Sequence, residues 1–158
     1  MPSNGSFAND ANSREVIAQR VVLGGGEDAP RRARIALDSM APGWLAGRGR
    51  EDVHLMTSEL VANSVRHAGA DDDHVISLDV TVVGHLMHVG VADDGPGFDP
   101  GSVPTPDPSR GHGWGLAIVE ALAARWGVVA RPSQVWFEFD HDLGPAQLSG
   151  ESGGGAVA

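Results

Sequence analysis

Glu59 and Asn63 are the residues whose types and spacing most directly suggest chemistry, and they stand four positions apart in the segment ELVANSVRHA (residues 59–68). In a helix, residues four apart lie on one face. A carboxylate would therefore lie one turn from a carboxamide, with Arg66 or His67 continuing the row. Such a row can hold a proton acceptor beside a ligand for a metal or a phosphate. The exposed polar face of an amphipathic helix is the simpler interpretation, and this segment alone favours it.

A second group follows an apolar segment, because DDGPG (93–97) comes directly after LMHVGVA (86–92). Alternation along a strand would place four residues on one face: Met87, Val89, Val91 and Asp93. The three apolar residues mark that face as buried, and a carboxylate at its edge needs donors, such as the amine of a flat ligand and an ordered water. Gly95 and Gly97 permit positive φ and a close approach of a ligand to the backbone. An ordinary Asp-Gly turn at the end of a strand is the alternative.

The third group is GHGWGL (residues 111–116), where three alternating glycines lead into a helical pattern. Free N–H groups and the helix dipole at such a start favour anions, and Arg110 and His112 could add positive charge toward phosphates. The spacing of the glycines, with no strand directly before them, does not match the dinucleotide-binding fingerprint. Together the three groups predict a site for a purine nucleoside triphosphate with a divalent cation.

The elements that must position these groups follow from periodicity and turn signals. We expect strands at residues 15–23, 75–83, 86–93, 128–130 and 134–139, and helices at 31–40, 51–67 and 114–126. Their irregular alternation predicts an α+β two-layer sandwich, with a mixed, mostly antiparallel sheet and about three helices on one face. The long loop at residues 94–113 indicates either a functional lid or a wrong assignment of elements there.

Finer features of the helices are also predicted. Spacing of three and four residues gives the second helix a buried stripe: Val53, Met56, Leu60 and Ser64. Gly47 and Gly49 predict a loop before that helix. Gly127 is expected to end the third helix, with Trp126 on its inner face.

Length and composition limit the possible classes of protein. A chain of 158 residues has room for one domain with a core, which we expect at residues 14–143, between disordered segments at 1–13 and 144–158. The net charge of -10 argues against general binding to nucleic acid or to anionic membranes. The absence of cysteine excludes disulfides, thiol catalysis and cysteine-based zinc sites. Because we find no signal peptide and no membrane-spanning run, we expect a cytoplasmic protein.

The three groups resemble the N, G1 and G2 boxes of the GHKL ATPases, the gyrase, Hsp90 and histidine-kinase type. The matching patterns are Glu59-x-x-x-Asn63, Asp93-x-Gly95-x-Gly97 and Gly111-x-Gly113-x-Gly115-Leu116. The segments TSELVANSVRHA (57–68) and VWFE (135–138) resemble one branch, the stand-alone anti-sigma-factor serine/threonine kinases of the RsbW/SpoIIAB type. The resemblance covers about residues 15 to 140 and implies the Bergerat-type ATP-binding fold.

The resemblance also implies a role for each matching residue, with ATP and Mg²⁺ as cofactors. Asn63 would ligate Mg²⁺, Glu59 would act as general base or orient the reacting group, and Asp93 would accept from the adenine amine. The remaining nucleotide-binding residues would border or line the lid: Gly95, Gly97, Arg110, His112, Gly113, Gly115 and Leu116.

One feature departs from this branch, which usually carries a Thr just before the VWFE strand, where the hydroxyl supports the adenine-binding Asp. Here the stretch is RPSQ (131–134). Either Gln134 or Ser133 would have to replace that hydroxyl.

The resemblance implies a regulatory kinase that phosphorylates an anti-anti-sigma (STAS-domain) partner and can also sequester a sigma factor. It implies no direct contact with nucleic acid or membrane, and it allows a homodimer. A split histidine-kinase catalytic domain is one alternative, disfavoured because we find no dimerisation hairpin with a phosphoacceptor His, no sensor and no membrane span. An ATP-binding interaction module with little or no catalysis is the other, and Glu59 argues against it.

Overall fold

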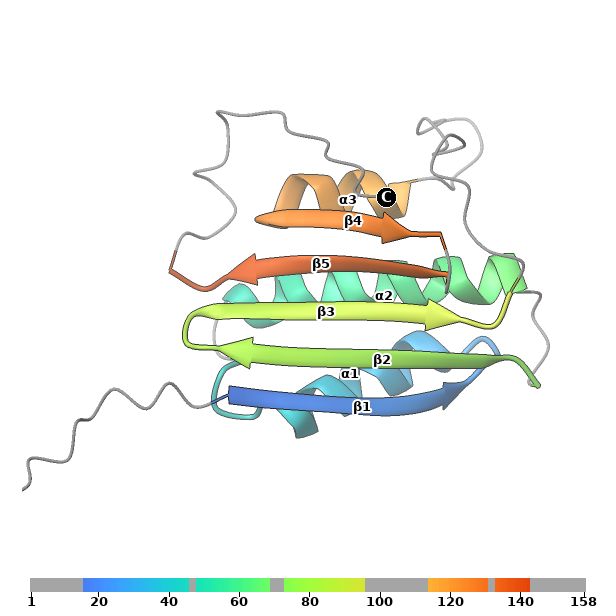
Figure 1. Ribbon diagram of the computed structural model, residues 1–158, viewed down its shortest axis with the longest axis horizontal. Coiled ribbons are helices and arrows are strands. Elements are labelled where there is room, and N and C mark those ends of the chain that lie inside the picture. Colours follow the sequence, from blue (N-terminus) through green and yellow to red (C-terminus); the bar gives the residue numbers. More distant parts are fainter. Residues whose placement is uncertain (1–15, 46–47, 69–72, 96–113, 131–132, 143–158) are drawn as a thin grey trace, which may run out of the picture.

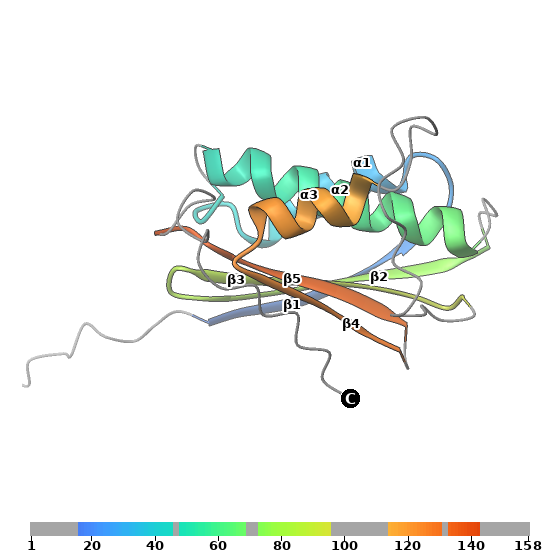
Figure 2. The ribbon, with the colours of Figure 1, turned by 90° about the horizontal axis from the view of Figure 1, so that it is seen from above.

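The computed structural model describes residues 16–45, 48–68, 73–95, 114–130 and 133–142. They form two layers, a five-stranded sheet and three helices that cover one of its faces (Figures 1 and 2). This confirms the α+β two-layer fold. The segments expected to be disordered (1–13 and 144–158) and most of the expected lid (96–113) lie outside the described residues.

The elements follow one another along the chain as β1 (Val16–Gly24), α1 (Ala29–Met40), α2 (Arg48–Ala68), β2 (Val75–Val83), β3 (Leu86–Asp93), α3 (Trp114–Leu122), β4 (Arg125–Val129) and β5 (Gln134–Asp140). The strands lie in the order β1-β2-β3-β5-β4. Every pairing between described strands is antiparallel, so the parallel component expected in a mixed sheet is not found among them.

The hairpin β2–β3 has the predicted form. Gly84 turns the chain with a φ of 61°, a conformation that favours glycine. In β2 the alternate residues from Ile76 to Val82 are buried against the helices, and in β3 the predicted face of Met87, Val89 and Val91 is buried too. Strand parity therefore directs the side chain of Asp93 toward the helix layer.

The core between the layers is built mainly from α2 and the central strands. The predicted stripe of Val53, Met56, Leu60 and Ser64 is buried, and Thr57 and Val61 lie beside it. The buried Phe137 of β5 faces this stripe from the sheet. Nothing in the described ranges is both long and apolar enough to form a membrane-spanning helix.

Two predicted helix boundaries were wrong. Helix α2 begins at Arg48, so Gly49 is helical, while Gly47 lies outside the described residues. Helix α3 ends at Leu122, and both Trp126 and Gly127 belong to β4. Tertiary packing explains the second error, because a Cβ on Gly127 would lie 2.8 Å from Cζ2 of Trp136 on the neighbouring strand. The glycine that was expected to end a helix instead accommodates an indole on the sheet.

Candidate functional site

Helix α3 begins against the face of α2 that carries Glu59 and Asn63. A Cβ on Gly115 would lie 3.0 Å from Nδ2 of Asn63 and 3.0 Å from Oε2 of Glu59. Gly115 is itself buried. Without a side chain, it lets the helix backbone approach both polar groups more closely than any other residue would. The first and third groups found in the sequence thus meet at one place.

The row on α2 combines an engaged carboxamide with a carboxylate that has no partner in the described ranges. Asn63 accepts a hydrogen bond at Oδ1 from the guanidinium of Arg66. Glu59 is half-buried, and no described residue donates a hydrogen bond to it. Arg66 is thus a side chain of this row that contacts Asn63. Asn63 Nδ2 and Glu59 Oε2 both border Gly115, whereas the amide oxygen of Asn63 is engaged by Arg66. The half-buried carboxylate is suited to accept a proton.

Asp93 ends β3 with one carboxylate oxygen engaged by a described residue. Its Oδ1 accepts a hydrogen bond of 3.0 Å from the backbone N–H of Gly95. Its own backbone N–H donates to the carbonyl of Ser133 at 3.2 Å. These contacts hold the carboxylate at the edge of the core, and within the described ranges no hydrogen bond to Oδ2 is found.

The structure distinguishes between the two candidates for supporting Asp93. Gln134 pairs with Ala92, and both lie on the sheet face away from the helices. A Cβ on Gly90 would collide with the Gln134 amide, which shows that this amide lies over the outer face. Ser133, just before β5, meets Asp93 through its backbone carbonyl. Gln134 therefore lies on the wrong face to support Asp93, which leaves Ser133 as the remaining candidate.

A second carboxylate, Asp94, holds the neighbouring strand end in place. Its Oδ1 accepts from the backbone N–H of Val75 at 3.3 Å and contacts His74 Nδ1 at 3.2 Å. The hydrogen bond from His74 is the main cause that lowers the pKa of Asp94. Gly25, at the end of β1, donates to the carbonyl of His74 at 2.8 Å. No local sequence pattern predicts this set of contacts, because its partners lie on three separate segments.

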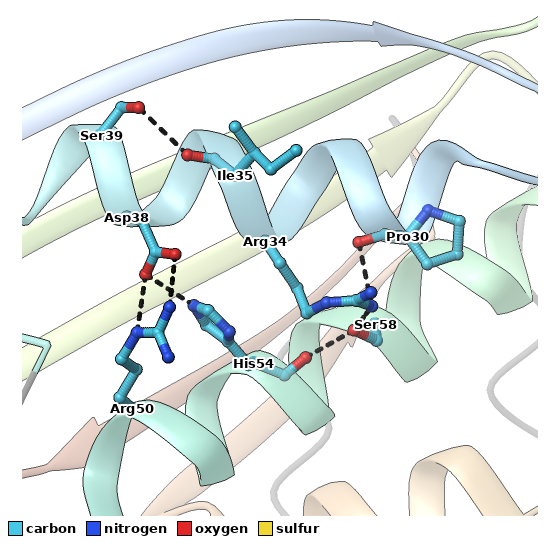
Figure 3. A network of polar contacts seen from close by, with 8 residues as sticks. All are labelled: Pro30, Arg34, Ile35, Asp38, Ser39, Arg50, His54 and Ser58. Carbon is cyan, nitrogen blue, oxygen red and sulfur yellow. Dashed lines mark hydrogen bonds and ion pairs between the residues drawn. The ribbon is translucent and has the colours of Figure 1, made fainter. Parts of the chain in front are cut away.

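On its opposite side, α2 is tied to α1 by a polar network (Figure 3). Asp38 accepts from Arg50 at 3.0 and 2.7 Å and from His54 at 2.9 Å. Arg34 donates to Ser58 Oγ at 2.8 Å, and Ser58 donates to the carbonyl of His54 at 2.7 Å. The hydrogen bond from Arg50 is the main cause that lowers the pKa of Asp38. Sequence analysis missed this network, which fixes α2 at the residue next to Glu59.

The predicted site residues divide into those that the structure describes and those outside it. The described ones lie at one end of the molecule, where the second half of α2, the end of β3 and the start of α3 come together (Figures 1 and 2): Glu59, Asn63, Asp93, Gly95, Gly115 and Leu116. Leu116 is buried in the core and anchors α3. The others lie outside the described residues: Gly97, Arg110, His112 and Gly113.

The donor set at Glu59 and Asn63 is suited to Mg²⁺ that is held mainly by other groups. No group of three His, Cys, Asp or Glu able to hold a metal occurs in the described ranges. Mg²⁺ usually keeps several waters and is bound by one or two protein oxygens together with substrate phosphates. One amide oxygen with a carboxylate one turn away would fit that pattern, provided that the amide oxygen of Asn63 exchanges its hydrogen bond from Arg66 for the ion.

Comparison with known families agrees with this geometry. Residues 27–137 of the 158 match the histidine kinase-like ATPase domain family. The chain therefore belongs to this family, within the GHKL superfamily of ATPases. A search of curated proteins gives no match. Family membership supports ATP as the ligand of the site, with Mg²⁺ as its usual companion.

Proposed function

We propose that this protein is an ATP-dependent serine/threonine kinase of the anti-sigma-factor type. It phosphorylates an anti-anti-sigma partner with a STAS domain, and it also sequesters a sigma factor in the cytoplasm. The observation that carries the proposal is the packing of Gly115 against both Glu59 and Asn63. The resemblance of residues 57–68 and 135–138 to that branch supports the choice of substrate.

Each residue of the site has a defined task in this proposal. Asp93 binds the adenine amine through the carboxylate oxygen that Gly95 leaves available. Asn63 would hold Mg²⁺, which would supply neutralisation of the charge that develops during phosphoryl transfer. Glu59 accepts the proton of the attacking hydroxyl or orients that hydroxyl for attack on the γ-phosphate. Phosphoryl transfer depends mainly on such positioning and charge neutralisation.

Transfer of labelled phosphate from ATP to a purified STAS-domain partner tests the proposal. We expect label on the partner that resists acid, as a phosphoserine or phosphothreonine does, and loss of that label with Glu59→Gln. The matched control is Glu51→Gln, because Glu51 is an exposed carboxylate in the first turn of the same helix. This control should transfer phosphate at the wild-type rate.

Other results of the same experiment would contradict the proposal. Acid-labile label would indicate a phosphohistidine and favour a split histidine kinase. ATP binding without transfer to any partner would favour an interaction module. Sequestration of a sigma factor is measured separately, by binding in the presence of ATP. A partner that is phosphorylated while the sigma factor is not bound would retain the kinase and remove the second role.

A further inference from the structure

The end of β3 is held from both sides at the position of Asp93. Toward β2, the described ladder ends with the pair of Ile76 and Asp93. Toward β5, the backbone N–H of Asp93 donates to the carbonyl of Ser133 at 3.2 Å. The end of β1, the start of β2 and the end of β3 lie at the same edge of the sheet (Figure 1). The next residue, Asp94, lies beyond the described ladder, so the turn that it begins depends on other contacts.

The side chain of Asp94 continues the attachment of β3 to β2 beyond this ladder. Its Oδ1 accepts from the backbone N–H of Val75 at 3.3 Å and contacts Nδ1 of His74 at 3.2 Å. Two donors at one oxygen restrain the direction of the carboxylate. Asp94 is bonded to Asp93 on one side and to Gly95 on the other. The restraint therefore acts directly on the turn in which the N–H of Gly95 donates to Oδ1 of Asp93.

The backbone of His74 is fixed independently of its side chain. The N–H of Gly25 donates to the carbonyl of His74 at 2.8 Å. Arg32 of α1 in turn donates to the carbonyls of Gly24 and Gly25, at 2.7 and 2.6 Å. The imidazole thus reaches Asp94 from a backbone that α1 and β1 hold in place. A substitution that changes only the ring leaves these backbone contacts intact.

The His74–Asp94 pair is too exposed to serve mainly as a source of stability. The side chain of His74 is 31% exposed and that of Asp94 is 50% exposed. Solvent and salt screen charges at such positions, and exposed ion pairs contribute little to the stability of the fold. The pair nevertheless restricts geometry beside Asp93. A binding group has to be held within about 0.5 Å of its productive position, and supporting hydrogen bonds supply that precision.

We infer that His74 is a positioning residue for adenine recognition: its hydrogen bond to Asp94 holds the turn 93–95, so that the carboxylate of Asp93 faces the adenine amine. His74 acts through Asp94 and does not itself touch the nucleotide. The inference rests on the proposed role of Asp93 as acceptor of that amine, and not on phosphoryl transfer or on a protein partner. It makes the imidazole a determinant of base selectivity, because the contribution of the amine depends on where the carboxylate lies.

Binding of two nucleotides separates this role from a general contribution to the fold. Inosine triphosphate carries an oxygen where adenine carries its amine, so it has no donor for Asp93 at that position. We expect the wild type to bind ATP at least about tenfold more tightly than inosine triphosphate, as is typical of a hydrogen bond to a charged group. His74→Leu should lower this ratio by about fivefold or more, through weaker binding of ATP alone. Calorimetric titration with Mg²⁺ present measures both affinities.

Two further variants serve as controls, and circular dichroism verifies the fold of each. His74→Asn keeps an N–H donor near the position of Nδ1, so it should restore most of the preference for ATP. His85→Leu removes a histidine from the turn at the opposite end of the same hairpin, where His85 lies 3.6 Å from Asp140. This variant should keep the preference of the wild type.

The possible outcomes distinguish the inference from the proposed function. A wild type that binds both nucleotides equally, or neither, would overturn the role of Asp93 and the inference with it. A wild type that prefers ATP, with a His74→Leu variant that keeps this preference, would overturn the inference alone. Equal weakening of both nucleotides by His74→Leu would also overturn it, because that result would indicate a structural role only.

Discussion

The two flanks of helix α2 carry similar polar residues, but these residues differ in their hydrogen-bond partners. Toward α1, Ser58 lies one turn after His54, and both side chains are hydrogen-bonded to α1 residues. Toward α3, Asn63 lies one turn after Glu59, and the side chain of Glu59 has no hydrogen-bond partner in the described ranges. Each flank has a pair of polar residues four apart, so local spacing cannot distinguish them.

The difference lies in what each flank meets. The α1 flank meets Arg34 and Asp38, whose charges and hydrogen bonds satisfy it, as most buried polar groups are satisfied. The α3 flank meets Gly115, which packs closely against the polar row and has no side chain that could donate a hydrogen bond to it. A satisfied flank holds the helix in place, whereas an unsatisfied flank is available to a ligand. We interpret the flank toward α1 as the one that holds the helix in place and the flank toward α3 as the candidate site.

The largest effect should come from Glu59→Ala. We expect phosphoryl transfer to fall by about 10²–10⁴-fold, the usual contribution of a general base, with the free energy of unfolding nearly unchanged. The matched variant on the other flank is Ser58→Ala, which should keep transfer within a few-fold of wild type. Initial rates with labelled ATP provide the measurement. If both variants lost phosphoryl transfer equally, the two flanks would not differ in function.

A smaller effect is expected for Gly115→Ala. The added methyl would press on Glu59 and Asn63 at 3.0 Å, and overpacking of this kind costs about 1–3 kcal/mol. We expect ATP affinity, measured by calorimetry, to weaken by about tenfold or more, since about 1.4 kcal/mol corresponds to tenfold. Gly43→Ala is the control, because a Cβ there meets nothing within 4 Å. An unchanged affinity for Gly115→Ala would remove α3 from the site.

The third side of α2, which faces the sheet, gives a prediction about stability alone. Thr57 is fully buried, and its hydroxyl has no hydrogen-bond partner among the residues that the structure describes. Thr57→Val replaces that hydroxyl with a methyl group of similar shape. We expect the free energy of unfolding to rise by about 1 kcal/mol, because the cost of a buried unsatisfied hydroxyl is removed. Urea denaturation measures this change, and a loss of stability would mean that the hydroxyl has a partner in solution.

The smallest effect is expected at the support flank and depends on pH. Arg50 lowers the pKa of Asp38 in the folded state below its unfolded value. The unfolded chain then binds the proton more readily, so the carboxylate contributes stability above its unfolded pKa and loses it as pH falls through the folded pKa. The pair is exposed and screened, so we expect Asp38→Asn to cost less than about 1 kcal/mol at pH 7. Urea denaturation of both proteins should show this difference disappearing in the acid range below pH 4, whereas a difference independent of pH would contradict the assigned cause.

Much of the fold and site could be predicted because their signals are local. The stripe of α2, the alternation of β2 and β3 and the glycine turn between them depend on periods of 3.6 and 2 within short segments. The inward face of Asp93 followed from the same parity. The third helix was predicted too long because its end depends on the packing of Gly127 against Trp136, a contact between strands that sequence spacing does not contain.

By itself, the sequence determined which residue types are available at the site and on which face of its own element each one lies. Tertiary structure decided which of these faces meet. It placed Gly115 against Glu59 and Asn63, directed Gln134 to the outer face, and joined Arg34 to Ser58. Spacing along one element fixes direction, because backbone geometry repeats, but contacts between elements depend on register and packing across the whole core.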